Sequence, residues 1–346
     1  MSLRIGWYVH HHGVGHLTRA RAVGQALVAR GHEVTLLGSR LGSEPLRGSS
    51  QSSSHLRERG SRVDLPMDDE GVDPHRDEVT AGGRLHWAPL RHSGFRDRGA
   101  AMAAWVADER PDVLVVDVSV ETALLGRLLG VPVVVVAQPG ERTDEPHRAV
   151  YDIASAVLAP WPAGWSQLVA PHLADARAEV VEVGGISRLA APAGVPATER
   201  QGVVLAGGEG FDDPDLADRI TASVPGLRWQ VLDGRTWVDD LAPVLAAAEV
   251  VVAHCGQNAV ADIAAIGRPT LLLPQERPFA DQDRLATALA ARGLARIVVR
   301  DRQRDPLTHW AAEVEASRVL PSRWEQWRTE GAVDRAAELV ERVGRD

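Results

Sequence analysis

The stretch Ala248–Asp283, AEVVVAHCGQNAVADIAAIGRPTLLLPQERPFADQD, decides the fold class of this chain. A β-branched run at Val250–Ala253 predicts a buried strand, and a polar turn with one glycine follows it. A helix that carries one acid, Asp262, comes next, and a second buried strand is predicted at Thr270–Leu273. A strand, a tight turn and a helix N-terminus form a cradle for phosphate, because free N–H groups and the helix dipole both favour an anion. The stretch therefore predicts an α/β unit that binds phosphate, with an acid placed to accept hydrogen bonds from ribose hydroxyls.

The rest of the chain alternates short β-branched runs with helical stretches rich in alanine, leucine and arginine. This alternation is the pattern of a parallel sheet with crossover helices, whose strands are largely apolar when both faces are covered. Further strands are predicted at Arg4–Val9, Glu33–Leu37, Val113–Val116, Val133–Ala137, Val180–Val183, Val203–Ala206, Trp229–Leu232 and Ile297–Val299. Helices are predicted at Thr18–Ala29, Arg96–Glu109 and Ser119–Leu129.

The length of 346 residues suggests two domains of ~150 residues each. We expect the first at 1–185 and the second at 201–320, joined by a linker at 186–200 within the stretch Gly184–Arg200, which is rich in glycine, alanine and proline. The tail at 321–346 has amphipathic patterning, and we expect it to form one or two helices that pack back on the first domain. The sequence therefore predicts two doubly wound parallel-sheet domains.

Composition excludes several kinds of partner and site. A formal net charge of −9 argues against a nucleic-acid partner. The chain contains no lysine, which excludes a lysine-dependent P-loop or Schiff base. Its single cysteine, Cys255, excludes an intramolecular disulfide and a multi-cysteine metal site. We interpret Cys255 as a small buried residue rather than a nucleophile.

Targeting signals are also missing from the sequence pattern. The N-terminus enters a strand pattern at once, without the features of a secretory signal. No stretch reaches the ~18 apolar residues of a membrane span. We expect a cytoplasmic protein whose contact with a membrane is at most peripheral.

Four features follow one another in the run Trp237–Asp283: the turn His254–Asn258, the acid Asp262, the Gly-Arg-Pro of 267–269, and Asp281–Gln282. This order and spacing resembles the donor-binding half of GT-B glycosyltransferases, most closely the N-acetylglucosaminyltransferase of peptidoglycan synthesis. It is also similar to the UDP- and TDP-sugar-dependent natural-product glycosyltransferases. The resemblance implies two Rossmann-like domains that face a cleft, with the donor bound by the second domain.

The resemblance also implies a role for each matching residue of the donor site. The turn residues that would face the diphosphate are His254, Gly256, Gln257 and Asn258. Asp262 would bind the ribose hydroxyls, and Asp281–Gln282 would hold hydroxyls of the donor sugar. The backbone of Val238 would pair with the base, and Gly207–Gly208 would lie on the diphosphate side. His254 taken alone could instead be a turn histidine whose hydrogen bonds are satisfied locally.

The first predicted strand runs into His10–His16, HHHGVGH, ahead of a predicted helix. The same families place a glycine-rich turn ending in Gly-His here, and in the natural-product branch a histidine of this domain deprotonates the acceptor. His16 is the best match, and an unperturbed pKa of ~6.5 suits a general base. The matching aspartate partner is Asp117, at the C-terminal end of a predicted strand, where open α/β sheets place their sites. Capping of the following helix is the alternative role for Asp117.

The remaining candidates concern the acceptor. Gly13 and Gly15 would let the backbone approach it closely. Residues expected to line its pocket are Gln138, Asp144 and His147, with Arg84, His86, Trp87 and His92 as further candidates. A metal site at His10–His12 is disfavoured, because neighbours along an extended chain point to opposite sides.

These residues together predict an inverting, metal-independent glycosyltransferase. The donor would be a nucleoside-diphosphate sugar, with UDP favoured over TDP, and it would be a co-substrate, so that no cofactor is required. The acceptor would be a hydroxyl or amine on a small molecule or a lipid-linked compound. The alternatives are a nucleotide-sugar 2-epimerase of the same fold and a non-catalytic nucleotide-sugar-binding protein. A dehydrogenase is disfavoured, because neither half has Gly-x-Gly-x-x-Gly followed ~20 residues later by an acid.

Overall fold

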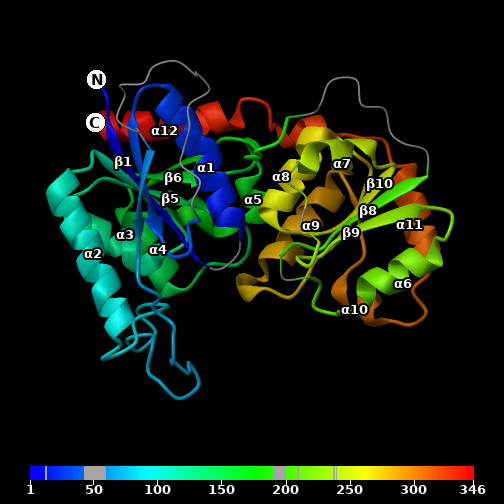
Figure 1. Ribbon diagram of the computed structural model, residues 1–346, viewed down its shortest axis with the longest axis horizontal. Helices are drawn as coiled ribbons and strands as arrows, with labels where there is room; N and C mark the ends of the chain where they lie inside the picture. The colour runs from blue at the N-terminus through cyan, green and yellow to red at the C-terminus, as the bar shows by residue number, and fades with distance from the viewer. Residues whose placement is uncertain (12–13, 43–59, 191–199, 209, 237, 239) are drawn as a thin grey trace.

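Two parallel sheets with helices packed around them form the protein, and Figure 1 shows them side by side. This computed structural model describes residues 1–11, 14–42, 60–190, 200–208, 210–236, 238 and 240–346. The arrangement confirms the predicted α/β class with two parallel sheets. Within the described residues, no helix is both long and apolar enough to cross a bilayer.

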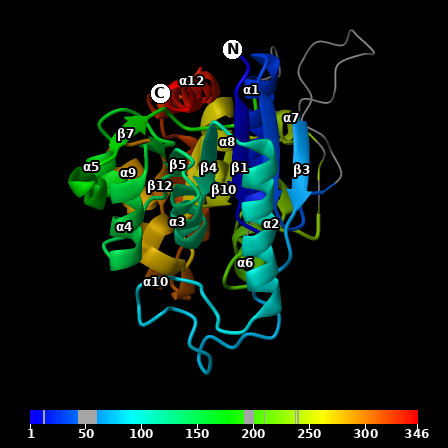
Figure 2. The same cartoon turned by 90° about the vertical axis from the view of Figure 1, so that its left-hand side faces the viewer.

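The first sheet has the strand order β3-β2-β1-β4-β5-β6-β7. Its strands are β1 (Arg4–Val9), β2 (Glu33–Gly38), β3 (Gly60–Asp64), β4 (Val113–Asp117), β5 (Val133–Val136), β6 (Ala156–Ala159) and β7 (Glu179–Glu182). The helical segments are α1 (Val14–Ala29), α2 (Ser93–Glu109), α3 (Val120–Leu128), α4 (Glu145–Ile153), α5 (Ser166–Val169) and η1 (Pro171–Asp175). Residues of α1 share one buried cluster with this sheet, and residues of α2, α3 and α4 share the other, so both faces are covered (Figure 2).

The second sheet has the order β12-β11-β10-β8-β9. Its strands are β8 (Gln201–Leu205), β9 (Arg228–Leu232), β10 (Val250–His254), β11 (Thr270–Leu273) and β12 (Arg296–Ile297). The helical segments are α6 (Leu216–Ser223), α7 (Leu241–Ala247), α8 (Gln257–Ile266), η2 (Pro278–Ala280), α9 (Asp281–Ala291), α10 (Arg300–Arg304) and α11 (Trp310–Arg318). The predicted strand–turn–helix unit is therefore β10, its turn and α8.

The C-terminal tail forms η3 (Trp324–Trp327) and α12 (Ala332–Arg345). The apolar face of α12 is buried in the same cluster as α1 and β1 of the first sheet. Several polar contacts join this helix to the first half; among them, Arg335 Nε donates to the carbonyl of Val183 at 2.7 Å, and His32 Nε2 lies 2.9 Å from Glu341 Oε1. The end of the chain thus packs on the domain that contains its beginning (Figure 1).

The strand order of each sheet indicates where a ligand would bind. In the first sheet the order reverses between β1 and β4, where Val9 pairs with Asp117. In the second it reverses between β8 and β10, where Leu205 pairs with Ala253. Ligands of open α/β sheets bind beyond the carboxyl ends of strands at such a switch point. The residues that follow these four strands are therefore the ones to inspect for a site.

Candidate active site

His16 and Asp117 meet at the switch point of the first sheet. His16 lies in the first turns of α1, and its Nδ1 is 2.9 Å from Oδ1 of Asp117, which ends β4. Arg19, one turn further along α1, donates from Nε to Oδ2 and from Nη2 to Oδ1 of the same carboxylate, each at 2.9 Å. The carboxylate and the guanidinium are both buried, and the His16 side chain is 20% exposed.

The electrostatics of this network fix the tautomer of His16. Burial alone would raise the pKa of Asp117, but the charge of Arg19 and the contacts with His16 outweigh it and lower that pKa to about 2. An ionised carboxylate can only accept, so the proton of the neutral His16 imidazole sits on Nδ1. Nε2 then keeps its lone pair and is available to a substrate.

Asp117 does not cap the helix that follows it, so the alternative role considered for it is wrong. Ser119 is the N-cap of α3, and its hydroxyl accepts from the backbone N–H of Thr122 at 3.1 Å. Between them, Val118 has φ +58°. A β-branched residue in the left-handed region is a true outlier, and such strain gathers at functional sites.

The two domains touch where α1 and α8 begin. Arg19 Nη1 donates to Gln257 Oε1 of the second domain at 2.8 Å. A Cβ on Gly15 would collide with the Asn258 side-chain amide, so glycine permits this approach. The His16–Asp117–Arg19 network is thus linked directly to the first turn of α8.

A cavity of about 590 Å³ opens between the domains at this point; we name it the glycine-rich cavity. The predicted donor residues that line it are Gly207, Gly208, Val238, His254, Gly256, Gln257, Asn258, Asp262 and Gln282. Gly15, predicted to contact the acceptor, lines this cavity as well, because its backbone lies against Asn258. Gly13 lies outside the described residues.

The floor of the glycine-rich cavity is suited to an anion. Gly256 is the N-cap of α8 and offers no side-chain hydrogen bond, so the first N–H groups of α8 are open to a ligand. His254 Nδ1 accepts from the N–H of Gly256 at 3.1 Å, which leaves the ring proton on Nε2. Burial, with a smaller contribution from Arg277, lowers the pKa of His254 to about 4, so the ring is neutral at pH 7. Gly207, with φ +79°, packs on this ring where a Cβ would be 2.9 Å from Nε2.

The three residues predicted to bind the ribose and the donor sugar, Asp262, Asp281 and Gln282, differ in where they lie. Asp262 is buried in the wall of the glycine-rich cavity and accepts from Ser187 Oγ at 2.6 Å; burial raises its pKa. Gln282 lines the cavity too, but its Oε1 accepts the backbone N–H groups of Cys255 and Gln275, each at 3.0 Å. Asp281 is absent from the described residues that line the two cavities, contrary to expectation. The loop before it turns through left-handed residues and places Asp281 against Gly140 of the first domain.

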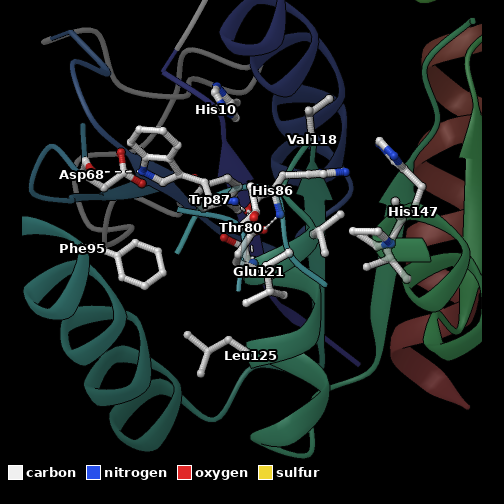
Figure 3. A pocket seen from close by; sticks show the side chains of 18 of the residues that line it. His10, Asp68, Thr80, His86, Trp87, Phe95, Val118, Glu121, Leu125 and His147 are labelled. Carbon is white, nitrogen blue, oxygen red and sulfur yellow. Dashed lines mark hydrogen bonds between the residues drawn. The ribbon is translucent and has the colours of Figure 1, made fainter. Parts of the chain in front are cut away.

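A second cavity, of about 810 Å³, lies beside β4 and α3; we name it the aromatic cavity. Its aromatic residues are Tyr8, Trp87, Phe95, Tyr151 and Phe279. Figure 3 shows Trp87, Phe95 and Leu125 around this space, with His86 next to Trp87 and His147 to one side. Most of the exposed wall is apolar.

The predicted acceptor residues Gln138, Asp144 and His147 line the aromatic cavity, as do His86 and Trp87. Arg84 and His92 do not belong to its described lining: Arg84 pairs with Glu145, and His92 is the N-cap of α2. The sequence did not indicate Tyr8, Phe95, Glu121 or Phe279. Of these, Glu121 Oε1 accepts the backbone N–H groups of His86 and Trp87, at 2.7 and 3.0 Å, and so holds the loop that carries them.

Asp144 joins two imidazoles in the wall of the aromatic cavity. Its carboxylate lies 2.9 Å from His86 Nε2 and 2.6 Å from His147 Nδ1. Burial would raise the pKa of Asp144, but hydrogen bonds from His147 outweigh it and lower the pKa. These three side chains could hold a metal, since their ligand atoms lie within 4.8 Å of one another, and so could His11, Asp68 and Asp69. Mutual hydrogen bonds in the first group and an ion pair of Asp68 with Arg98 in the second already compensate these charges.

Acid should destabilise the protein through its buried histidines. Burial lowers the pKa of His147, His172 and His254 to about 4 each, against ~6.5 when unfolded. Between these values the unfolded chain binds more protons, so stability rises with pH and falls as pH drops from ~6.5 towards 4. The slope is at most ~1.4 kcal/mol per pH unit for each ring, and less where solvent reaches it. We expect the melting temperature to fall from pH 7 to pH 5 and the fall to be smaller in His172→Asn; a constant melting temperature would contradict this.

Comparisons with known proteins match this chain to glycosyltransferases. Residues 196–309 match the model of the glycosyltransferase family 28 C-terminal domain. Over 113 residues, 31% of this chain, the sequence is 40% identical to the UDP-N-acetylglucosamine--N-acetylmuramyl-(pentapeptide) pyrophosphoryl-undecaprenol N-acetylglucosamine transferase of Rhodopseudomonas palustris. Over 241 residues, 57% of this chain, it is 31% identical to the protein of the same name from Sorangium cellulosum. The matched regions span 30% and 56% of these two relatives.

Solved structures resemble the whole chain. A calicheamicin glycosyltransferase has a TM-score of 0.64 at 17% identity, over 99% of this chain and 98% of that one. MurG of Acinetobacter baumannii has a TM-score of 0.61 at 14% identity, over 99% and 100%. Identities this low show a shared fold, and they confirm the predicted one. Residues 196–309 of this chain are therefore similar to the C-terminal domain of glycosyltransferase family 28, and the chain as a whole has the two-domain GT-B fold.

Proposed function

We propose that this protein transfers a sugar from a nucleoside-diphosphate sugar to an acceptor hydroxyl or amine, with inversion and without a metal ion. A UDP-sugar is the favoured donor, and a TDP-sugar is the other candidate. One observation carries the proposal: the His16–Asp117 pair, which is not in the described lining of either cavity, lies beside His10, a residue that the two cavities share. His10 lines both cavities, and its ring centroid is 6.0 Å from that of His16.

Each cavity supplies what one substrate needs. In the glycine-rich cavity, the N–H groups of α8 and His254 Nε2–H are donors for the diphosphate, and the charge of Arg277 adds to them. Asp262 is the acceptor for ribose hydroxyls. The aromatic cavity is the place for the acceptor. It favours transfer over nucleotide-sugar 2-epimerisation, which requires no acceptor pocket.

The reaction follows as a single displacement. Nε2 of His16 removes the proton from the acceptor, and the oxygen or nitrogen attacks the anomeric carbon on the face opposite the diphosphate. The new bond forms as the bond to the diphosphate breaks, and the leaving group departs with the electron pair. The carboxylate of Asp117 stabilises the His16 imidazolium by accepting the hydrogen bond from Nδ1–H of His16. One displacement inverts the anomeric configuration.

The aromatic cavity also favours one class of acceptor. Its volume of about 810 Å³ lies within the ~300–1,000 Å³ range of sites for compact ligands. Its wall combines aromatic rings with a few polar groups such as Gln138, whose Nε2 is buried without a hydrogen-bond partner among the described residues. We therefore favour a compact, largely apolar acceptor with a polar group over a long lipid-linked one.

The donor is tested first by thermal shift with UDP, TDP, GDP and their sugars. A ligand at 100 times its Kd stabilises the protein by ~2.7 kcal/mol, so the correct nucleotide should raise the melting temperature clearly. Release of that nucleotide is then measured with small aromatic alcohols and amines as acceptors. Failure of every nucleoside diphosphate to stabilise the protein would overturn the proposed function.

Asp262→Ala should weaken nucleotide binding ~10–100-fold, because hydrogen bonds to a charged group contribute ~1.5–3 kcal/mol. Isothermal titration calorimetry with the nucleotide selected above measures the change. Ser187→Ala is the matched control: it removes the hydroxyl that contacts Asp262 and keeps the carboxylate. Unchanged affinity in Asp262→Ala would remove this acid from the ribose site.

A further inference from the structure

One short loop of the second domain reaches both cavities. The loop follows β11, contains Arg277 and η2, and ends at the first turn of α9, which carries Gln282. Arg277 and Gln282, at its two ends, line the glycine-rich cavity. Phe279, between them, lines the aromatic cavity, and the other described residues of its lining come from the first domain. The acceptor wall is therefore completed by the domain that binds the donor.

Phe279 is held by the first domain through its backbone and its ring. Its carbonyl accepts the N–H of Glu141 at 2.7 Å. The guanidinium of Arg142 lies over the ring at 4.6 Å from its centroid, and Arg142 is itself buried. The His147 ring packs edge-on at 4.9 Å, and the His86 ring lies at 5.8 Å. A cation over an aromatic face is attractive, and more so away from water. The ring thus contacts the histidines that line the acceptor space.

The loop adopts this shape against its own backbone preference. Phe279 has φ +62° and Ala280 has φ +52°, and neither is glycine. Left-handed non-glycine residues persist only when their surroundings determine them. The surroundings here are the contacts with Glu141 and Arg142, together with the close approach of Gly140, where a Cβ would meet the Phe279 carbonyl. Loop shape and domain contact therefore depend on each other.

We propose that Phe279 is a positioning residue that couples the two cavities, so that a bound nucleotide tightens acceptor binding. A nucleotide that contacts Arg277 and Gln282 fixes both ends of the loop and thereby favours the shape that presents Phe279 to the acceptor. Coupling of this kind is reciprocal, so an acceptor tightens nucleotide binding by the same factor. The inference rests on the proposed function, because it takes the glycine-rich cavity as the nucleotide site.

The test measures the Kd of a fluorescent apolar probe, 8-anilinonaphthalene-1-sulfonate, with and without the saturating nucleoside diphosphate selected by thermal shift. We expect the nucleotide to lower the probe's Kd by ~5-fold or more in the wild type, within the usual range of coupling between sites. In Phe279→Ala the factor should fall towards 1, while the nucleotide still binds. Ala280→Gly is the matched control: it keeps the ring and accepts a positive φ, so the coupling should persist.

A second variant locates the probe. Gly99 lines the aromatic cavity, and a Cβ there meets no atom within 4 Å, so Gly99→Leu is chosen to occupy part of the cavity. Loss of probe binding in Gly99→Leu places the probe there. If the probe binds elsewhere, hydrogen exchange tests the coupling instead. Bound nucleotide should slow exchange of the Glu141 amide in the wild type, and it should slow this exchange less in Phe279→Ala.

The outcomes separate this inference from the proposed function. The coupling is overturned, and the proposed function stands, if a nucleotide binds but changes neither the probe's Kd nor the exchange of the Glu141 amide. The same holds if the nucleotide changes these readouts equally in the wild type and in Phe279→Ala. If no nucleoside diphosphate binds, the proposed function fails and the inference fails with it.

Discussion

His16→Ala is expected to lower kcat by ~10²–10⁴-fold, the range that a positioned general base contributes. Nδ1 of His16 is committed to the ionised Asp117, so the variant removes Nε2, the nitrogen of this ring that is left to take the acceptor's proton. Nucleotide affinity should stay unchanged, because His16 is not among the described residues that line the glycine-rich cavity. Initial rates at saturating donor, with calorimetry of nucleotide binding, measure the two effects separately.

His10→Ala is the matched control for this prediction. Its ring lies 6.0 Å from His16 and lines both cavities, so it is the nearest alternative base. We expect it to change the KM for the acceptor more than kcat. A large loss of kcat in His10→Ala with little loss in His16→Ala would transfer the base role to His10. Equal loss of nucleotide binding and transfer in His16→Ala would remove the base role altogether.

The fold could be predicted from sequence wherever a strand is buried on both faces. β1, β10 and β11 are apolar runs with clear ends, and they appear within one residue of their predicted bounds. β6 was missed because AVLA is as typical of a helix as of a strand, and β3 because GSRVD is a polar edge strand. α4 was also missed, although Asp144 as N-cap followed by Glu-Pro is a recognisable helix start.

The site could be predicted only where one sheet edge determines it. His16 and Asp117 follow neighbouring parallel strands, so topology alone brings them together. Phe279 could not be found in this way, because its place depends on how the domains meet and on two left-handed residues without glycine. The same turn accounts for Asp281, which the sequence motif placed at the sugar and the structure places at the domain contact.

Asp117→Ala is expected to destabilise the protein by ~3–5 kcal/mol, the cost of breaking a buried ion pair from one side. The Arg19 guanidinium is almost fully buried and would lose its contacts to both carboxylate oxygens. The amide of Gln257, to which it also donates, is neutral and cannot replace the charge of the carboxylate. Since whole domains are stable by only ~5–15 kcal/mol, urea denaturation at pH 7 should show a large shift of the midpoint.

The double variant Asp117→Leu with Arg19→Met separates this stability effect from catalysis. Apolar residues in place of a buried pair are often neutral or stabilising, so we expect most of the loss in unfolding free energy to be recovered. Sugar transfer should remain impaired, because the double variant still lacks the Asp117 carboxylate that holds the proton of His16 on Nδ1. If the free energy of unfolding of Asp117→Ala lay within ~1 kcal/mol of the wild-type value, the prediction would be contradicted. A loss that small is typical of an ion pair exposed to solvent. Recovery of full transfer in the double variant would show that Asp117 acts on stability alone and that His16 needs no partner.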